Sequence, residues 1–587
     1  MDSEDAPPNH IPRRDEYEEG EAKRHLRGWL SYAFASEVFV VVSLTLFLPI
    51  CLEQFARDNG YLLPDKTRPC STEKPAPLNA ADAAEDTRCV VKVGWIWVDS
   101  ASFSLYVYSI SVALQALTVI SMGGIADHPL SAPHRKRALL LFAALGSISA
   151  MLFLALPSSS SVWPLAALFA IIANVGFGAS VVAMNAYLPT LAREDKTVVA
   201  ALQELHSSDH ASILIPQWDS EERESDGDTY EEPLLPREHR ASPEAQALLE
   251  KYISLVSQTT ARISGTGIAL GYFAGIVALV IALVPVTLMK GSTFSLRLAI
   301  FASGLWWALF TIPAGTWLPG TSSLLLKESS GETGPFSLKR EIWKAWQRLG
   351  QMLRWTEIKR LKHTFLFLGA WFLLSDGFTT ITSTALLFGK TQLHMPANSL
   401  IIVGLLVNAA GVVGALVWPL IQRRVGWSNK RVLITLVCAC SFIPLYGCLG
   451  FLPLFHSHSA NVNANTLVAT PHFGGLTTPG EMYALAVYFG AVYGAFQAYA
   501  RAFYAELVPR GEEARWYALY SITDKSSSFL GPLVVGLIAD ATGNIRYSFF
   551  FLVVMIWSAL PLLWSVNVER GREDAHKYSE READQRT

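Results

Sequence analysis

Charged residues are scarce in this chain. Asp, Glu, Lys and Arg make up 17% of its 587 residues, whereas hydrophobic residues make up 51%. A soluble domain carries about 25% charged residues, so this deficit argues against a soluble protein. The net charge of −3 gives no sign of a nucleic-acid-binding surface. No zinc-ligand spacing, nucleophile–base motif or phosphate-binding loop is present. We therefore expect no enzyme activity, no cofactor, no metal site and no nucleic-acid partner.

Cysteine is also rare, with 6 residues in the chain. Cys70 and Cys89 share a polar segment that follows the first apolar run. A disulfide between them is expected if that segment faces an oxidising compartment, and two unrelated thiols are the alternative. No signal-peptide core precedes the first apolar run, so we expect the amino-terminal tail to stay in the cytosol.

Long hydrophobic runs are abundant. A membrane-spanning helix needs about 20 mainly apolar residues. Twelve segments meet this requirement: 30–52, 101–126, 138–157, 162–191, 263–289, 297–319, 364–389, 397–421, 431–454, 481–505, 516–539 and 546–568. The pattern predicts an all-α integral membrane protein with twelve transmembrane helices in two six-helix halves.

The predicted spans divide the chain into five parts. These are a tail (1–29), a first half (30–319), a linker (320–363), a second half (364–568) and a second tail (569–587). The first half includes a polar outer loop at 53–100 and an inner loop at 192–262, which is too poor in apolar residues to fold alone. The linker has an amphipathic, cationic pattern over 336–355, which predicts a helix on the membrane surface.

Lys and Arg residues in the short loops indicate the orientation. They gather in loops that lie on the same side as the amino terminus, at Arg135-Lys136-Arg137, Arg423-Arg424, Lys430-Arg431 and Arg515. Because inner loops carry the excess of Lys and Arg, both termini are expected in the cytosol. The inner loop also contains Glu231–Leu235 and Glu244–Leu249, which resemble acidic dileucine sorting signals for endosomal and vacuolar membranes. A short amphipathic helix over 244–258 is the alternative for the second.

Two acids lie inside predicted spans in the same local pattern. Glu37 occurs in Ser-Glu-Val-Phe and Asp376 in Ser-Asp-Gly-Phe, in the first and seventh spans. An intramembrane carboxylate costs about 2.5–3.5 kcal/mol by insertion scales, and it suggests a substrate or ion pathway. Both acids could carry protons or bind the ammonium group of a substrate, and a structural role is the alternative.

Other polar residues in the spans extend this hypothesis. Lys525 either pairs with Asp376 or binds a substrate carboxylate. Its neighbour Asp524 points about 100° away around the helix, so we expect the two not to face each other. Asn185 in the fourth span is expected either to line the pathway or to hydrogen-bond between helices.

Corresponding loops of the two halves resemble the major facilitator superfamily. The loop after the second span has Gly124, Asp127 and the basic run Arg135, Lys136 and Arg137, stretched by an insertion with two prolines. The exit of the tenth span has Glu506, followed by Arg515. The resemblance implies two halves related by an axis along the membrane normal and a cytosolic gate at these charged residues.

Several spans also resemble the autophagy-related protein 22 family. They include WLSYAFASEVF, NAYLP, LLSDGFTTITSTALLFGKTQL and YSITDKSSSFLGPLVVGLIADATGNIRYSFFFL. The resemblance implies a fungal vacuolar membrane protein that exports amino acids to the cytosol after autophagic degradation. Proton coupling is our hypothesis from the intramembrane acids. A transporter of another small solute, or a nutrient sensor or scaffold that does not transport, is the alternative. Membrane lipids are the other expected partner, and the sequence gives no oligomeric state.

Overall fold

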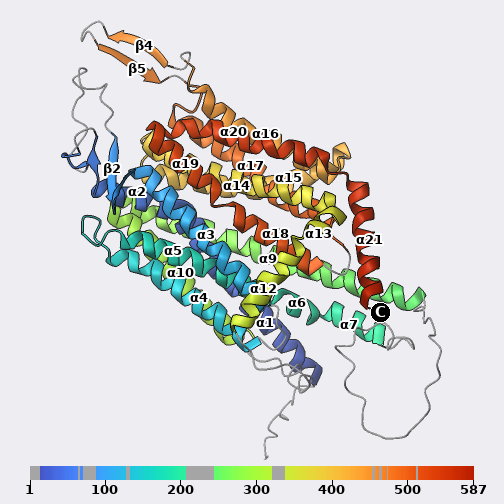
Figure 1. Cartoon of the computed structure of the whole chain (residues 1–587). Coiled ribbons are helices and arrows are strands. Elements are labelled where there is room, and N and C mark those ends of the chain that lie inside the picture. The colour runs from blue at the N-terminus through green and yellow to red at the C-terminus, as the bar shows by residue number, and fades with distance from the viewer. Residues whose placement is uncertain are drawn as a thin grey trace, which may run out of the picture.

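The fold is almost entirely helical (Figure 1). The computed structural model describes residues 14–63, 66–70, 88–126, 132–206, 243–319, 338–452, 456–461, 466–471, 473–509 and 513–586. Within these ranges, ten helices are long and apolar enough to cross a membrane: Gly20–Asp58, Ser100–Met122, Arg135–Ala155, Leu165–Arg193, Arg262–Leu288, Thr293–Trp317, Lys362–Thr391, Ala397–Val425, Asn429–Leu449 and Ile545–Ser565.

The first half of the chain, residues 14–319, contains six of these ten helices. Its elements are α1 (Arg14–Val38), the π-helix η1 (Phe39–Phe47), α2 (Leu48–Asp58), α3 (Ser100–Ala126), α4 (Ala132–Leu152), the 3-10 helix η4 (Phe153–Ala155), α5 (Leu165–Asn185), α6 (Leu188–Arg193), α7 (Lys196–His206), α9 (Pro243–Leu288) and α10 (Thr293–Trp317). The π-helix interrupts the first span and begins two residues after Glu37. Such π-helical turns often occur at functional sites.

The second half follows the linker helices. Its elements, with the linker and the carboxyl-terminal helix, are α12 (Leu338–Met352), α13 (Trp355–Arg360), α14 (Lys362–Thr391), α15 (Ala397–Val425), α16 (Asn429–Leu449), α17 (Pro479–Ala505), α18 (Glu513–Ser527), α19 (Leu530–Thr542), the 3-10 helix η7 (Ile545–Tyr547), α20 (Ser548–Ser565) and α21 (Val568–Arg586). α12 covers most of the range 336–355 over which the linker helix was predicted, and its place on a membrane surface stays a prediction.

The count of twelve spans is not confirmed. The predicted spans 481–505 and 516–539 correspond to α17 and to α18 with α19, which are not among the ten apolar helices. The second of these spans is also not continuous, because a turn at Ser528 and Phe529 separates α18 from α19. Hydropathy alone predicted one helix here, since the break lies inside a run of small and apolar residues.

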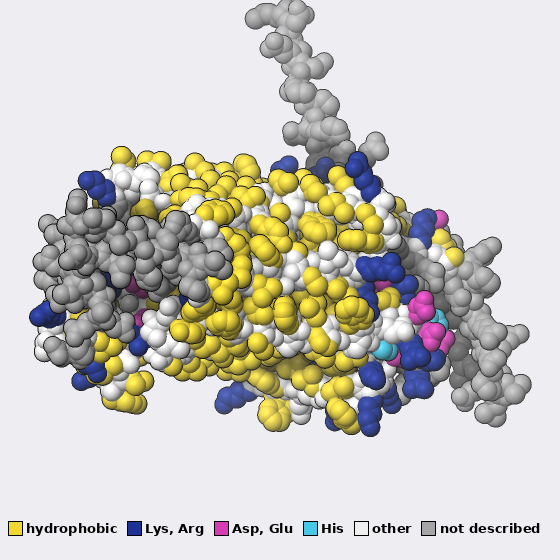
Figure 2. Space-filling view, turned by 90° about the horizontal axis from the view of Figure 1, so that it is seen from above, with side chains coloured by type: hydrophobic (Ala, Val, Ile, Leu, Met, Phe, Trp, Pro, Cys, Tyr) yellow, Lys and Arg dark blue, Asp and Glu magenta, His cyan; other side chains and the backbone are white. Residues whose placement is uncertain are grey.

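The two ends of the helical bundle differ in structure (Figure 1). One end, called the hairpin end below, has the antiparallel strands β1 (Tyr61–Leu62), β2 (Cys89–Val93) and β3 (Ile96–Asp99) and the strand pair β4 (His456–Asn461) and β5 (Thr466–Pro471). The opposite end, called the tail end, has α6, α7, α12, α13 and α21. Figure 2 shows apolar side chains around the middle of the molecule and Lys and Arg side chains gathered at the tail end.

Part of the inner loop is more ordered than its composition predicted. Residues 196–206 form α7, and residues 243–262 form the first turns of α9. Two ion pairs hold α9 to the α7 segment, each at 2.6 Å: Lys251 pairs with Glu204 of α7, and Arg262 pairs with Asp195, the residue before α7. Residues 192–262 were expected to be too poor in apolar residues to fold alone, and in the structure these two parts of the loop are helices that pack against each other. The motif at 231–235 lies outside the described residues, and 244–249 is helical.

Close helix packing joins α1 to α9 within the first half. Gly267 and Gly271 of α9 face α1, and Gly275 faces Val41 of η1. A Cβ at Gly271 would lie 2.8 Å from the Cβ of Glu37. Small residues at this spacing let two helices approach closely. The halves meet along α3 with α18 and α19, and along α9 with α15.

Candidate functional site

Asp376 lies in the middle of α14 and is 2% exposed. Both of its carboxylate oxygens accept hydrogen bonds from the backbone N–H of Gly531, at 2.8 and 3.0 Å. The hydroxyl of Thr380, one turn along α14, donates to one of them at 3.3 Å. Gly531 is the second residue of α19, so Asp376 satisfies an N–H group that has no partner within that helix. A negative charge is also favourable at a helix amino terminus.

Ser375, the residue before Asp376, binds the α18 side of the break between α18 and α19. The hydroxyl of Ser375 donates to a carboxylate oxygen of Asp524 at 2.5 Å, near the carboxyl end of α18. Consecutive residues of α14 therefore hold the last turn of α18 and the first turn of α19. Gly531 is required at this contact, because a Cβ there would lie 1.9 Å from the Thr380 hydroxyl oxygen.

Lys525 does not pair with Asp376. Its ammonium lies 3.3 Å from the carboxylate of Asp524, its neighbour in α18, so the expectation that these two residues do not face each other was wrong. The flexible lysine side chain can fold back along the helix. The Lys525 side chain is 45% exposed and that of Asp524 is 23% exposed, so this ammonium is also accessible to another partner.

Glu37 brings a negative charge to this region from the first half. It lies in the last turn of α1 and is partly exposed. Lys525 of the second half is close enough to interact with it electrostatically. The first half therefore contributes a negative charge and the second half a positive charge. We call Glu37 and Lys525 the central pair.

Three tyrosines accompany the central pair, and sequence reasoning missed all of them. Tyr272 of α9 interacts electrostatically with Glu37, and Tyr493 of α17 interacts with both members of the pair. Tyr108 of α3 interacts with Tyr493, Asp376 and Asp524. Each tyrosine is flanked by ordinary apolar and small residues, so only the folded structure distinguishes it from the other tyrosines of the chain.

Asn185 is not part of this group. It is the last residue of α5 and is exposed. The neighbouring Met184 carbonyl accepts a hydrogen bond from the indole of Trp29, eight residues before Glu37. Eight residues of helix correspond to about 12 Å, so Asn185 lies towards the tail end.

The predicted gate residues near the second and third spans bind within the first half. Asp127 lies outside the described residues. Arg135 donates to the carbonyl of Ala186 at 3.0 Å, and Lys136 donates to the carbonyl of Leu318 at 2.7 Å. Arg137 is exposed. These contacts hold α4 against the ends of α5 and α10, and they do not join the two halves.

The predicted gate residues of the second half also make contacts inside that half. Glu506 accepts hydrogen bonds from Asn429 at 2.7 Å and from Arg572 of α21 at 2.6 Å. Arg515 lies near the start of α18 and is half-buried. The contacts of Glu506 connect α21 to the tail ends of α16 and α17.

Polar contacts between the halves occur near the hairpin end. The ammonium of Lys390 in α14 lies 2.5 Å from the carboxylate of Glu53 in α2, and it also donates to the Ile50 carbonyl at 2.9 Å. The side chain of Glu53 is 1% exposed and that of Lys390 is 13% exposed. This buried ion pair was not predicted, because its partners lie near the ends of two distant spans.

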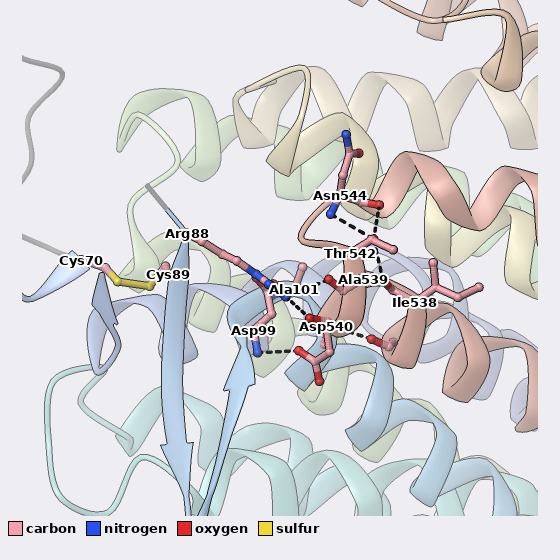
Figure 3. A network of polar contacts seen from close by, with 12 residues as sticks. Cys70, Arg88, Cys89, Asp99, Ala101, Ile538, Ala539, Asp540, Thr542 and Asn544 are labelled. Atoms are coloured by element: carbon pink, nitrogen blue, oxygen red, sulfur yellow. Dashed lines mark hydrogen bonds and ion pairs between the residues drawn. A yellow bond between two sulfur atoms is a disulfide. The ribbon is translucent and has the colours of Figure 1, made fainter. Parts of the chain in front are cut away.

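A second contact joins the hairpin to α19 (Figure 3). Arg88 forms an ion pair with Asp99 at 3.1 Å and donates to the carbonyls of Ala539, at 2.9 Å, and Asp540. The carboxylate of Asp540 accepts from the backbone N–H of Asp99 at 2.8 Å and from the Tyr106 hydroxyl at 2.7 Å. We call Arg88, Asp99, Tyr106 and Asp540 the hairpin clasp. Burial raises the pKa of Asp99, against the opposing effects of the Ala101 N–H and Arg88.

A disulfide supports the position of Arg88. Cys70 and Cys89 are joined, with 6.0 Å between their Cα atoms. Cys89 follows Arg88 directly and begins β2, which pairs with β3 and so with Asp99. The disulfide is one of the two alternatives that the sequence left open. It anchors the segment that carries Arg88 beside the carboxyl end of α19.

Comparisons with known proteins place this arrangement in a family. The family model described as "Vacuole effluxer Atg22 like" matches residues 21–576. The chain belongs to the Atg22 family. Autophagy-related protein 22 of Cryptococcus neoformans is 41% identical, covering 95% of this chain and 97% of that protein. Autophagy-related protein 22 of Botryotinia fuckeliana is 40% identical, covering 95% of this chain and 82% of that protein.

The fold of this Atg22 family member also occurs among solved transporters. A D-xylose-proton symporter superposes with a TM-score of 0.50 at 10% identity, covering 94% of this chain and 98% of that one. At this identity the likeness shows the fold alone, which is of the major facilitator type. Family and fold are thus those of transporters.

Proposed function

We propose that this Atg22 family member exports amino acids from the vacuole lumen to the cytosol. The central pair is the observation that carries the proposal. An amino acid has an ammonium and a carboxylate separated by one carbon atom. Glu37 offers a partner for the ammonium and Lys525 offers one for the carboxylate, and they come from opposite halves. A zwitterion bound between them would therefore contact both halves at once.

We propose that the hairpin end faces the lumen and the tail end faces the cytosol. The Cys70–Cys89 disulfide supports this orientation, because disulfides persist in oxidising compartments. The Lys and Arg side chains at the tail end support it as well, since cytosolic loops are enriched in these residues (Figure 2). The family description supports the vacuole as the location.

In this orientation, the polar contacts between the halves at the hairpin end would close the lumenal side. The Glu53–Lys390 ion pair and the hairpin clasp both join α2 or α3 of the first half to the second half. Transporters of this fold expose a midplane site to alternate sides by rocking one half against the other. Loading from the lumen would then require both contacts to separate, and release to the cytosol would occur in the arrangement described here.

Proton coupling is assigned to Glu37 in this proposal. Asp376 has two backbone hydrogen bonds from Gly531 and braces the α18–α19 break. Glu37 is partly exposed, and Lys525, Tyr272 and Tyr493 are close enough to interact with its carboxylate electrostatically. A carboxyl group in this position can exchange a proton for the substrate ammonium, which links the two ligands to one site.

The test is counterflow in proteoliposomes. Labelled neutral, acidic and basic amino acids, together with D-xylose, would be offered at two lumenal pH values. We expect flux of amino acids, loss of at least tenfold in Glu37→Gln and Lys525→Met, and wild-type flux in Asn185→Ala as the matched control. Flux of the sugar alone, or no flux of any solute by the folded wild-type chain, would contradict the proposal.

A further inference from the structure

The linker between the halves exposes an unusual combination of cations and indole rings. Residues 338–360 contain seven Lys and Arg residues against two Glu residues. Trp343 is 66% exposed and Trp355 is 68% exposed. The exposed cations of this surface are Lys339, Arg340, Arg348, Arg354, Lys359 and Arg360. We call these residues, with the two tryptophans, the linker surface.

The linker surface has a fixed place in the fold. The indole N–H of Trp346 in α12 donates to the hydroxyl of Ser121 in α3 at 3.3 Å. Met352, at the end of α12, is buried, so one side of the helix packs against the bundle. The opposite side presents Trp343 away from the protein core. α12 is therefore packed against the bundle, and Trp343 is nevertheless exposed.

The depth of the linker surface is set by the spans on either side. α10 ends at Trp317, and α14 begins at Lys362, two residues after α13. Both are helices apolar enough to cross a membrane. α12 and α13 therefore lie at the level where apolar spans end at the tail end, as Figure 1 shows. That level corresponds to the lipid headgroups, where tryptophan rings are enriched.

Within the part of the chain that the structure describes, most of the charge on the linker surface has no acidic partner. Glu357 pairs with Arg360 at 3.0 Å. Lys359 lies over the ring of Trp355, 5.6 Å from its centre. No hydrogen bond or ion pair of the Lys339, Arg340, Arg348 or Arg354 side chains is seen with the described residues. A row of cations beside exposed indoles is complementary to anionic headgroups that overlie acyl chains.

We propose that α12 and α13 form a binding surface for anionic phospholipid headgroups of the leaflet at the tail end. The guanidinium and ammonium groups bind the headgroup phosphates, and Trp343 and Trp355 insert their rings at the boundary of the acyl chains. Because α12 is hydrogen-bonded to α3, bound lipid also holds the tail end of a helix whose other end forms the hairpin clasp.

The test measures lipid retention and does not depend on transport. The full chain in mild detergent is incubated with equal amounts of phosphatidylserine and phosphatidylcholine, and the retained lipids are counted by native mass spectrometry. We expect the wild type to retain phosphatidylserine in excess. The excess should fall by roughly threefold or more when Lys339, Arg340, Arg348 and Arg354 are all changed to Gln, because each cation near the headgroups adds to the attraction.

A matched variant separates this surface from the general positive charge of the tail end. Arg570, Lys577 and Arg581 of α21 are exposed cations outside the linker and beyond the last apolar span, and changing all three to Gln should leave the phosphatidylserine excess unchanged. Added salt should reduce the wild-type excess, because the Debye length falls from about 10 Å at 0.1 M to about 3 Å at 1 M. Equal retention of the two lipids by the wild type, or an equal loss in both variants, would overturn the proposal.

Discussion

The carboxylate of Glu53 and the ammonium of Lys390 lie 2.5 Å apart, across the boundary between the two halves. Both side chains are largely buried, so this is an ion pair removed from water. Removing one member of a buried pair leaves an uncompensated charge, at a cost of about 3–5 kcal/mol. Replacing both members by uncharged residues costs much less.

Lys390→Met is therefore expected to destabilise the arrangement with a closed hairpin end. Glu53→Gln combined with Lys390→Met should restore most of the loss. Melting temperatures of the two single variants and the double variant give the coupling between the residues. If the double variant loses as much as the sum of the single variants, the pair does not stabilise this state.

Asp376 is expected to act through its hydrogen bonds to Gly531. Asn keeps an oxygen that can accept the Gly531 N–H, whereas Ala does not. Asp376→Asn should therefore retain transport within a few fold of wild type, and Asp376→Ala should lose at least tenfold. Removing a helix cap costs about 0.5–2 kcal/mol. Vesicle flux and melting temperature would be measured together.

The outcome for Asp376→Asn decides between a bracing role and a proton-carrying role. A variant that keeps its melting temperature but loses the pH dependence of flux would show that the charge of Asp376 itself takes part in coupling. Gly531→Ala is the complementary change, since its Cβ would lie 1.9 Å from the Thr380 hydroxyl oxygen. Thr380→Ala should partly relieve that variant.

The hairpin clasp should depend on pH through Asp99. Burial raises the pKa of Asp99 above its usual value of about 3.9. A raised pKa means that the clasp favours the protonated form, so this contribution to stability is present in acid and is lost as pH rises through the raised pKa. The melting temperature of the wild type relative to Asp99→Asn should therefore fall as pH rises from about 3.5. A difference that grows with pH would contradict this.

The disulfide should stabilise the hairpin and the contacts that it supports. Cys70 and Cys89 are separated by 19 residues in sequence, and closing such a loop is worth about 3 kcal/mol. Cys70→Ser with Cys89→Ser should lower the melting temperature, and a reductant should lower that of the wild type but not that of the double variant. Equal sensitivity of both proteins to the reductant would rule out this role.

The apolar spans could be predicted because their hydropathy signal is strong and local. The intramembrane acids could be predicted too, since a charge in such a span stands out. The bonding of Asp376 was not predicted, because it depends on a break between Ser527 and Leu530. The local signal for that break is Pro532, which has no N–H to bond the carbonyl of Ser528, and the sequence analysis did not use it. Sequence reasoning offered Asp376 as one of two alternative partners for Lys525, and it excluded Asp524 because adjacent helical residues point about 100° apart. The ion pair of Lys525 with Asp524 shows that a flexible side chain can overcome this angle.

Contacts between segments that are distant in the sequence could not be predicted either. Glu53 and Lys390 are 337 residues apart, and Arg88 reaches α19 from a loop that was read only as polar. Nothing in the local pattern indicates which charged residues at the ends of spans will meet. The gate residues implied by the family resemblance are the converse case. The hydrogen bonds seen for Arg135, to the Ala186 carbonyl, and for Glu506, from Arg572, each lie inside one half.

The most direct test of the central claim is a comparison of substrate analogues in the variants of the central pair. Counterflow would be measured with a transported amino acid, its amide and the corresponding amine, in wild type, Glu37→Gln and Lys525→Met. If Lys525 binds the carboxylate, the wild type should prefer the amino acid to both analogues that lack this group by at least tenfold, and Lys525→Met should lose that preference while Glu37→Gln keeps it. An unchanged preference in Lys525→Met would contradict the account.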